Sequence, residues 1–230
     1  MLDWQPKAPY TAEQLLEILR ILRDPENGCP WDKVQTHASI RKNFLEETCE
    51  ALEAIDADDP QLMQEELGDV LMQVAFHTCM EQETGRFTWE QVCDGVCQKL
   101  IERHPNIFGT QPGYEGITDW DALKNKEKGR RTLADDLESV PRAMPALMRA
   151  AKLQKRAARH GAALQGADAA ALADAAENLQ TAQPASAQAE QAVGELLFAA
   201  ANLARQAGVD PEQALQKANE AFCTAAGPVA

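Results

Sequence analysis

The sequence lacks the long hydrophobic segments that membrane proteins and secretory precursors carry. No stretch of the 230 residues approaches ~18 uninterrupted apolar residues, which is about what a membrane-spanning helix needs. The first residues show neither the basic region nor the apolar core of a secretory signal peptide. We therefore expect a cytoplasmic protein that has no membrane as a partner.

Basic residues are also few. The chain has 22 lysines and arginines against 36 aspartates and glutamates, so its formal net charge is −14 at pH 7. Nucleic-acid binding requires a basic surface, which excludes DNA and RNA as expected partners. Small anions remain possible ligands where a metal ion or a local basic pair offsets the repulsion. The six cysteines form no Cys-x-x-Cys pair and the four histidines do not cluster near them, which argues against a zinc site or a disulfide framework.

Alternating runs typical of β-strands are nearly absent. Long proline-free segments can hold helices instead, because proline breaks the helical hydrogen-bond ladder. Two capping-box pairs, Thr11 with Gln14 and Thr88 with Gln91, predict where two helices begin. The sequence thus predicts an all-α fold, with helices near residues 11–23, 39–57, 61–83, 88–103 and 145–160 and a short one after Trp120.

Alanine usage divides the chain, with 11 alanines in residues 1–149 and 29 in residues 150–230. A weak internal repeat crosses this division in a conserved order. The aligned segments are 45–50 with 172–177, 66–72 with 192–198, and 97–102 with 215–220. We interpret the chain as two tandem helical modules, 1–125 and 146–230, joined by a linker at 126–145.

Five carboxylates on two neighbouring predicted helices are the candidates for chemistry: Glu46, Glu47, Glu50, Glu66 and Asp69. The three on helix 39–57 share an arc of about 100° opposite an apolar side, which by itself favours a solvated face. Helix 61–83 is apolar nearly all round, which predicts burial. Buried carboxylates are costly unless they are paired or bind a metal. Attraction to the helix N-terminus would explain Glu66 but not Asp69.

Converging carboxylates without histidine or thiolate suit a hard cation, so we predict a Mg²⁺ site. A positive partner for a phosphate is available on helix 88–103, where Lys99 and Arg103 are spaced i, i+4. These two side chains could equally be cations that extend to solvent at a helix end.

The acidic pattern resembles that of the MazG family of nucleoside triphosphate pyrophosphohydrolases. Glu46-Glu47-x-x-Glu50 is followed after 15 residues by Glu66-x-x-Asp69, and Gly-Cys-Pro-Trp-Asp at 28–32 and Gln-Thr at 35–36 lie upstream. The segments 99–108 and 141–156 extend the resemblance over residues ~11 to ~222.

The resemblance implies an all-α homodimer that uses Mg²⁺ to hydrolyse nucleoside triphosphates between the α and β phosphates. The monophosphate and pyrophosphate would be the products, with broad nucleotide specificity and a house-cleaning or signalling role. The matching metal-binding acids are Glu47, Glu50, Glu66 and Asp69.

The resemblance also implies roles for residues around these acids. Glu46, next to the metal-binding acids, would take the proton from an attacking water. Lys99, and less directly Arg103, would hold phosphate oxygens. Trp31 would stack on the base or, as we rather expect, pack in the interior.

In the second module the positions that match the five acids are Ala173, Asp174, Glu177, Ala192 and Glu195. Since alanine cannot bind a metal, we expect this module to be weak or inactive although Lys217 is retained, and we expect activity to depend on the first module. Two alternatives remain. The chain could be a helical scaffold or regulator that has lost the chemistry, or a narrow phosphoribosyl-nucleotide pyrophosphohydrolase.

Overall fold

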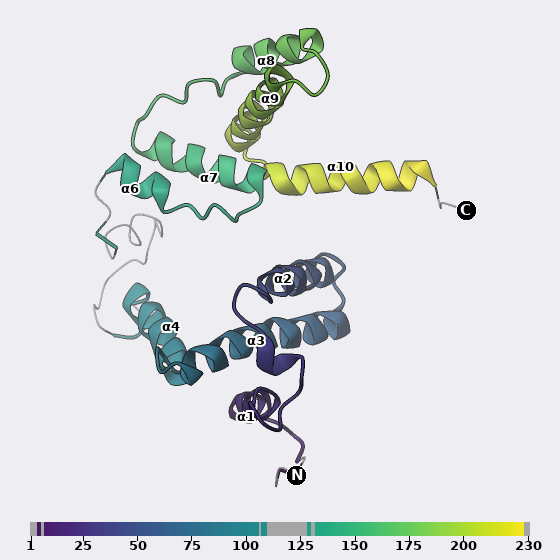
Figure 1. The fold of residues 1–230 in the computed structure, drawn as a ribbon. Coiled ribbons are helices and arrows are strands. Elements are labelled where there is room, and N and C mark those ends of the chain that lie inside the picture. Colours follow the sequence, from purple (N-terminus) through teal and green to yellow (C-terminus); the bar gives the residue numbers. More distant parts are fainter. Residues whose placement is uncertain (1–3, 6, 106, 110–127, 130–131, 228–230) are drawn as a thin grey trace. The chain divides into compact units, whose positions relative to one another are not determined.

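The computed structural model describes residues 4–5, 7–105, 107–109, 128–129 and 132–227. All regular structure in this part of the chain is helical, which confirms the all-α prediction (Figure 1). The chain divides into two compact units, Met1–Gly116 and Ile117–Ala230. The short helix expected after Trp120 falls outside the described residues. None of the described helices combines the length and hydrophobicity that crossing a bilayer requires.

The first unit contains a helical hairpin with further helices before and after it. Its elements are α1 (Ala12–Leu22), the short 3₁₀ helix η1 (Asp32–Val34), α2 (Arg41–Asp56), α3 (Pro60–Glu83) and α4 (Trp89–Arg103). The predicted capping boxes begin α1 at Thr11 and α4 at Thr88, and Pro60 occupies the first turn of α3. Figure 1 shows α2 lying along α3, with α1 on another side of α3.

The core of the first unit surrounds the C-terminal half of α3. Leu16 and Leu19 of α1 pack there with Phe76 and Met80 of α3, and Ile40 completes the cluster. The expectation that α3 is buried all round is therefore correct only for this half. Towards the N-terminal half, Leu67 is 51% exposed and Leu71 is 40% exposed. The difference arises because α1 covers only part of the length of α3.

Helix α2 packs on α3 through small residues. Its buried residues are Ala51 and Ala54, whereas Leu45, Leu52 and Ile55 are each more than half exposed. The alternative in which the leucine side of α2 is buried is therefore wrong, whereas the acidic side is partly solvated, since Glu46 and Glu50 are exposed and Glu47 is half-buried. Small side chains allow the two backbones to approach closely, which brings part of the acidic side of α2 next to α3.

A tight turn joins α2 to α3. Asp58 adopts a left-handed backbone conformation with φ of 51°. Asp59 caps α3, and its carboxylate accepts hydrogen bonds from the backbone N–H groups of Gln61 at 3.0 Å and Leu62 at 3.1 Å. Aspartate tolerates the left-handed conformation better than most residues. The turn therefore fixes the start of α3 shortly after the end of α2.

The second unit contains α6 (Leu133–Glu138), α7 (Ala146–Arg159), α8 (Ala169–Thr181), α9 (Ala187–Gln206) and α10 (Pro211–Ala226). Helices α8 and α9 pack as a pair, α7 packs on α9, and α6 packs on α7. These two paired helices correspond in the repeat alignment to α2 and α3. The origin of the two units by duplication stays a prediction.

Part of the segment expected to be a linker forms α6 instead. Asp136 of this helix is fully buried and pairs with the Arg156 guanidinium of α7, with Nη1 and Oδ1 2.9 Å apart. His160 approaches the other carboxylate oxygen of Asp136 at 3.2 Å. Such pairing offsets the cost of burying the charge, and it holds residues 133–138 on the second unit.

Candidate metal centre

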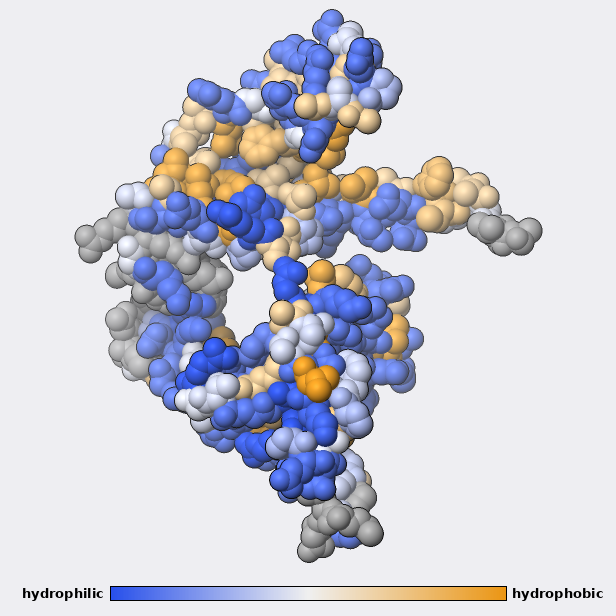
Figure 2. Space-filling view, viewed as in Figure 1, coloured by the Kyte–Doolittle hydropathy of each residue, from blue (hydrophilic) through white to orange (hydrophobic). Residues whose placement is uncertain are grey.

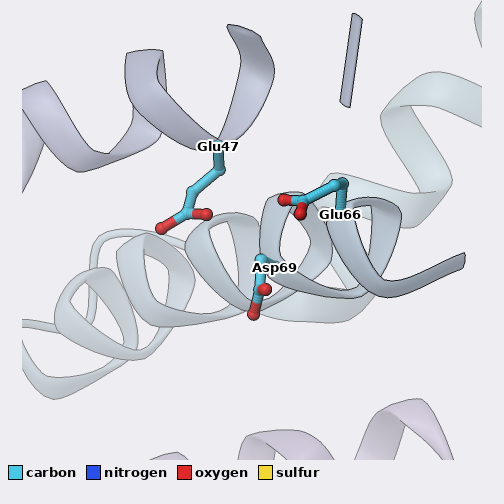
Figure 3. A group of neighbouring side chains, drawn as sticks. All are labelled: Glu47, Glu66 and Asp69. Carbon is cyan, nitrogen blue, oxygen red and sulfur yellow. The ribbon is translucent and has the colours of Figure 1, made fainter. Parts of the chain in front are cut away.

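Three of the predicted acids come together in the first unit. Glu47 of α2 and Glu66 and Asp69 of α3 each place one carboxylate oxygen so that these oxygens lie within 4.8 Å of one another. Figure 3 shows Glu47 extending from α2 towards α3, which carries the other two. Glu66 and Asp69 share a face because they are three residues apart on a helix. All three side chains are half-buried. We call Glu47, Glu66 and Asp69 the acidic trio.

The negative charges of the acidic trio repel one another. Desolvation raises the pKa of Glu47, and the neighbouring charges of Asp69 and Glu50 raise it further. The pKa of Glu66 is also raised, first by desolvation and then by Glu50 and Asp69. Like charges held this close disfavour ionisation. A bound cation would relieve the repulsion, and oxygen ligands alone suit a hard ion such as Mg²⁺.

The other two predicted acids on α2 differ in their relation to the trio. Glu50 is exposed and lies outside the group of converging oxygens, yet its charge acts on both Glu47 and Glu66. Glu46 is also exposed, and its charge acts on Glu47. Glu50 is thus the nearer candidate for a fourth ligand, and Glu46 lies at the edge of the site.

The predicted phosphate-binding residues lie on α4, which follows the C-terminal end of α3. Lys99 is exposed on α4, which follows the opposite end of α3 from Glu66 and Asp69. Arg103 is half-buried in the last turn of the same helix. No described interaction links Lys99 to the trio. The roles of both residues therefore stay predictions.

Trp31 does not pack in the interior. Its side chain is 56% exposed just before η1, so the expectation of buried packing is wrong. Arg23 holds the segment after Trp31 by donating to the backbone carbonyls of Asp32 at 2.8 Å and Gln35 at 3.2 Å. An exposed indole on a loop held in this way is free to contact a ligand, and stacking on a base stays a prediction.

Sequence reasoning missed a row of polar side chains on α3 that continues from the acidic trio. Asp69, Gln73, His77 and Glu81 follow one another at intervals of four residues, so they lie along one face. Gln73 is 5% exposed and Glu81 is 8% exposed. Their spacing was the available signal, because residues repeated every four positions share one face of a helix, and polar groups that are buried there need hydrogen-bond partners.

The far end of this row holds a pair of histidines. The Nδ1 atoms of His37 and His77 are 2.7 Å apart and their rings stack. His37 Nε2 lies 2.6 Å from the Glu81 carboxylate, which also pairs with Arg86. The row therefore connects α3 to the loop before α2 as well as to α2 itself.

The second unit has no comparable trio among its described residues. Asp174 and Glu195, which match Glu47 and Asp69, line a cavity of about 740 Å³ between α8 and α9 together with Asn178 and Phe198. Ala192, which matches Glu66, is 2% exposed. Two carboxylates and an alanine remain where the first unit has its trio, in agreement with the sequence comparison of the two modules.

Comparisons with known proteins point to one family. A family model described as the MazG nucleotide pyrophosphohydrolase domain matches residues 35–108, which include α2, α3 and α4. The chain is similar to a nucleoside triphosphate pyrophosphohydrolase of Escherichia coli strain K12, with 42% identity over 219 residues, covering 91% of this chain and 83% of the relative.

Two further relatives carry related names. The chain is 39% identical over 218 residues to a nucleoside triphosphate pyrophosphohydrolase/pyrophosphatase MazG of Thermotoga maritima, covering 94% of this chain and 84% of the relative. It is 34% identical over 154 residues to a nucleoside triphosphate pyrophosphohydrolase of Mycobacterium tuberculosis, covering 65% of this chain and 46% of that protein.

Proposed function

Since the chain belongs to the MazG family of nucleotide pyrophosphohydrolases, we propose that it hydrolyses nucleoside triphosphates to the monophosphate and pyrophosphate. The observation that carries this proposal is the acidic trio, whose oxygens lie within 4.8 Å of one another. A cytoplasmic location and a broad choice of nucleotide belong to the same proposal.

Glu47, Glu66 and Asp69 are the residues that would hold Mg²⁺, with Glu50 as the fourth acid. When bound there, Mg²⁺ supplies positive charge that offsets the charge of the phosphates and orients them. The donor set supports this choice, because the trio offers oxygen ligands and Glu50 acts on two of its members. A bound cation would also reduce the repulsion among these carboxylates, which favours cation binding at this site.

The remaining roles belong to residues around the trio. Glu46 lies one residue before Glu47 and is exposed, so its carboxylate is available to accept the proton of an attacking water. Lys99 and Arg103 would bind phosphate oxygens, and Trp31 would stack on the base. Helix α4 follows the end of α3 that is opposite to Glu66 and Asp69. Lys99 would therefore bind the phosphates most readily if it came from a second copy of the chain.

A direct assay tests the proposed reaction. Pyrophosphate release is measured from a mixture of nucleoside and deoxynucleoside triphosphates with Mg²⁺, for the wild type and for Glu66→Gln. We expect release from the wild type and a loss of about 100-fold or more in the variant, since a metal ligand is removed. Glu65→Gln, on the same helix turn, is the matched control. Equal rates in wild type and Glu66→Gln would refute the assignment, and no release from the wild type would favour a scaffold.

A homodimer is also part of the proposal. Large apolar side chains lie exposed on three consecutive helices of the first unit: Leu45, Leu52 and Ile55 on α2, Leu67 and Leu71 on α3, and Val96, Leu100 and Ile101 on α4. In the face shown in Figure 2, hydrophobic residues interrupt the hydrophilic surface of both units. A second copy of the chain would bury these side chains, since exposed apolar surface on several neighbouring helices is typical of an interface.

Analytical ultracentrifugation of the full chain tests the dimer. We expect the wild type to sediment as a dimer, and Leu52→Lys, which places a charge in the exposed apolar surface of α2, to sediment as a monomer. Glu53→Lys alters an exposed position next to it and should leave the dimer intact. A monomeric wild type would refute this part of the proposal.

A further inference from the structure

A cluster of titratable side chains lies towards the C-terminal end of α3, away from the acidic trio. The Nδ1 atoms of His37 and His77 are 2.7 Å apart, and the planes of the two rings differ by only 5°. The Nε2 atom of His37 lies 2.6 Å from a carboxylate oxygen of Glu81. We call His37, His77 and Glu81 the histidine cluster. It joins the segment before α2 to α3, because His37 precedes α2 and the other two residues belong to α3.

The distance between the two Nδ1 atoms limits how many protons the two imidazoles can carry. Two ring nitrogens this close form a hydrogen bond only when one carries the proton and the other offers a lone pair. When both rings are protonated, each Nδ1 carries a proton and each ring a positive charge, so the two side chains repel each other. The observed geometry therefore requires that at least one of the two histidines is neutral.

The surroundings indicate which histidine is the neutral one. His37 faces the Glu81 carboxylate through Nε2 and His77 through Nδ1, so a protonated His37 has an acceptor beside each of its ring nitrogens. His77 is half-buried, and its pKa is lowered first by desolvation and then by His37, while Glu81 opposes the shift. His77 is therefore the member of the pair that stays neutral.

The other groups around the histidine cluster are apolar or already paired. Arg86 places its Nε atom 2.6 Å from the second carboxylate oxygen of Glu81. Helix α2 places the ring of Phe44 edge-on to His77, with ring centroids 5.7 Å apart. Residues of α1, of its C-cap and of α4 contact this half of α3 as core side chains or as polar pairs: Leu16, Leu19, Trp89, Arg20 with Gln82, and Arg23 with Glu83. The single negative charge of Glu81 is thus already shared by Arg86 and His37, which leaves a second charged histidine uncompensated.

We propose that the histidine cluster is a pH-sensitive attachment of the segment before α2 to α3. While His77 is neutral, the two Nδ1 atoms stay in contact and hold residues 36–40 on α3. When His77 also takes up a proton, the two rings separate and this segment is released. The attachment does not depend on metal binding or on the proposed hydrolysis, because none of its residues belongs to the acidic trio.

A second attachment limits which residues are released. The side chain of Arg23 is only 7% exposed, and it donates to the backbone carbonyls of Asp32 at 2.8 Å and Gln35 at 3.2 Å. A guanidinium stays charged throughout the pH range in which histidine titrates. Release is therefore confined to the residues after Gln35, where the backbone N–H groups of Ser39 and Ile40 donate to the carbonyl of Thr36.

Amide hydrogen exchange of the full chain, followed by NMR at about pH 7.5 and about pH 5, tests the proposal. Rates are corrected for the pH dependence of chemical exchange. We expect the amides of Ser39 and Ile40 to exchange at least ~10-fold faster at the lower pH, since one unit of difference between the pKa of His77 in the attached and released states corresponds to a tenfold change. The amide of Lys33, before the Arg23 attachment, and that of Phe76 in the core should not respond, which shows that the opening is local.

Variants show whether the histidines cause the opening. His77→Gln cannot titrate, so Ser39 and Ile40 should exchange at similar corrected rates at both pH values. His160→Gln is the matched control, because His160 approaches Asp136 in the second unit and not the histidine cluster, and it should keep the wild-type response. His37→Gln serves as a second variant if His77→Gln does not fold.

Two results would overturn the inference. One is a wild type whose Ser39 and Ile40 amides do not respond to pH, and the other is a response that persists in a folded His77→Gln or His37→Gln chain. Pyrophosphate release from the same preparations is measured separately at neutral pH. Failure of the pH-sensitive attachment would therefore leave the proposed function in place, and loss of the proposed function would leave the attachment in place.

Discussion

Glu47 and Glu66 are carboxyl groups whose pKa values are raised by desolvation and by neighbouring acids. Their pKa values in the folded chain lie above the ordinary value of 4.5, so the folded state holds these protons more tightly than the unfolded state. Stability is therefore lost as pH rises through the folded pKa values. At neutral pH the charges of Glu47 and Glu66 therefore destabilise the fold, and a bound cation would restore part of that loss.

We predict that Glu47→Gln raises the melting temperature at neutral pH in the absence of divalent cations. In a chain of this length, each kcal/mol of repulsion removed corresponds to roughly 2–4 °C. Added Mg²⁺ should stabilise the wild type and not the variant. Differential scanning calorimetry with and without Mg²⁺ makes the measurement, with Glu53→Gln, an exposed acid of α2, as the control. If Glu47→Gln melted at a lower temperature than the wild type, the repulsion between Glu47 and its neighbouring acids would not destabilise the fold, and the prediction would be wrong.

For His77, the predicted change of stability with pH has the opposite sign. Burial lowers its pKa, the nearby His37 lowers it further, and Glu81 opposes the shift. The folded pKa lies below the ordinary value of 6.5, so the stability from neutral His77 is complete above about pH 6.5 and is lost as pH falls through the folded pKa. We expect urea unfolding between about pH 7.5 and pH 5 to show a steeper loss in the wild type than in His77→Gln. Parallel curves would contradict this.

At the scale of elements, the α2–α3 hairpin decides whether the three acids meet. Ala54 is fully buried where α2 packs, and the helices are close because the side chain is small. Ala54→Leu should destabilise the chain by about 1–3 kcal/mol through overpacking. It should also weaken Mg²⁺ binding, because Glu47 moves away from Glu66. Denaturant unfolding and calorimetric titration measure the two effects, and Ala57→Leu, at an exposed position, should show neither.

Local features of these elements could be predicted from the sequence. Thr11, Thr88 and Pro60 mark helix starts because capping involves neighbouring residues, and the structure confirms each one. The approach of Glu47 to Glu66 and Asp69 could be predicted from helix periodicity, which places Glu66 and Asp69 on one face, and from the family resemblance.

Which face of each helix is covered could not be predicted. The exposed Leu52 on α2 and the exposed Trp31 depend on where other elements pack, and sequence periodicity carries no information about that. Gln73 was missed for the same reason, since its burial depends on where the other helices pack. The six-residue helix α6 is too short to show a period, and its burial depends on Arg156 of α7.

At the scale of the whole molecule, the acids are distributed unequally between the two units. Asp174 and Glu195 line the cavity of the second unit, but no third carboxylate joins them among the described residues. We predict that the double variant Asp174→Asn with Glu195→Gln releases pyrophosphate at the wild-type rate. The matching change in the first unit, Glu47→Gln with Asp69→Asn, should abolish release. Loss of activity in the first of these variants would locate chemistry in the second unit.

The continuity of α3 has a genetic consequence. The core holds the C-terminal half of this helix, around Phe76 and Met80, while Glu66 and Asp69 are on the N-terminal half. A single codon gained or lost between the two halves preserves the reading frame and the helix. It also rotates the acids by about 100° relative to the core and to Gln73. Insertions and deletions in this short stretch of the gene should therefore be eliminated by selection even where substitutions persist.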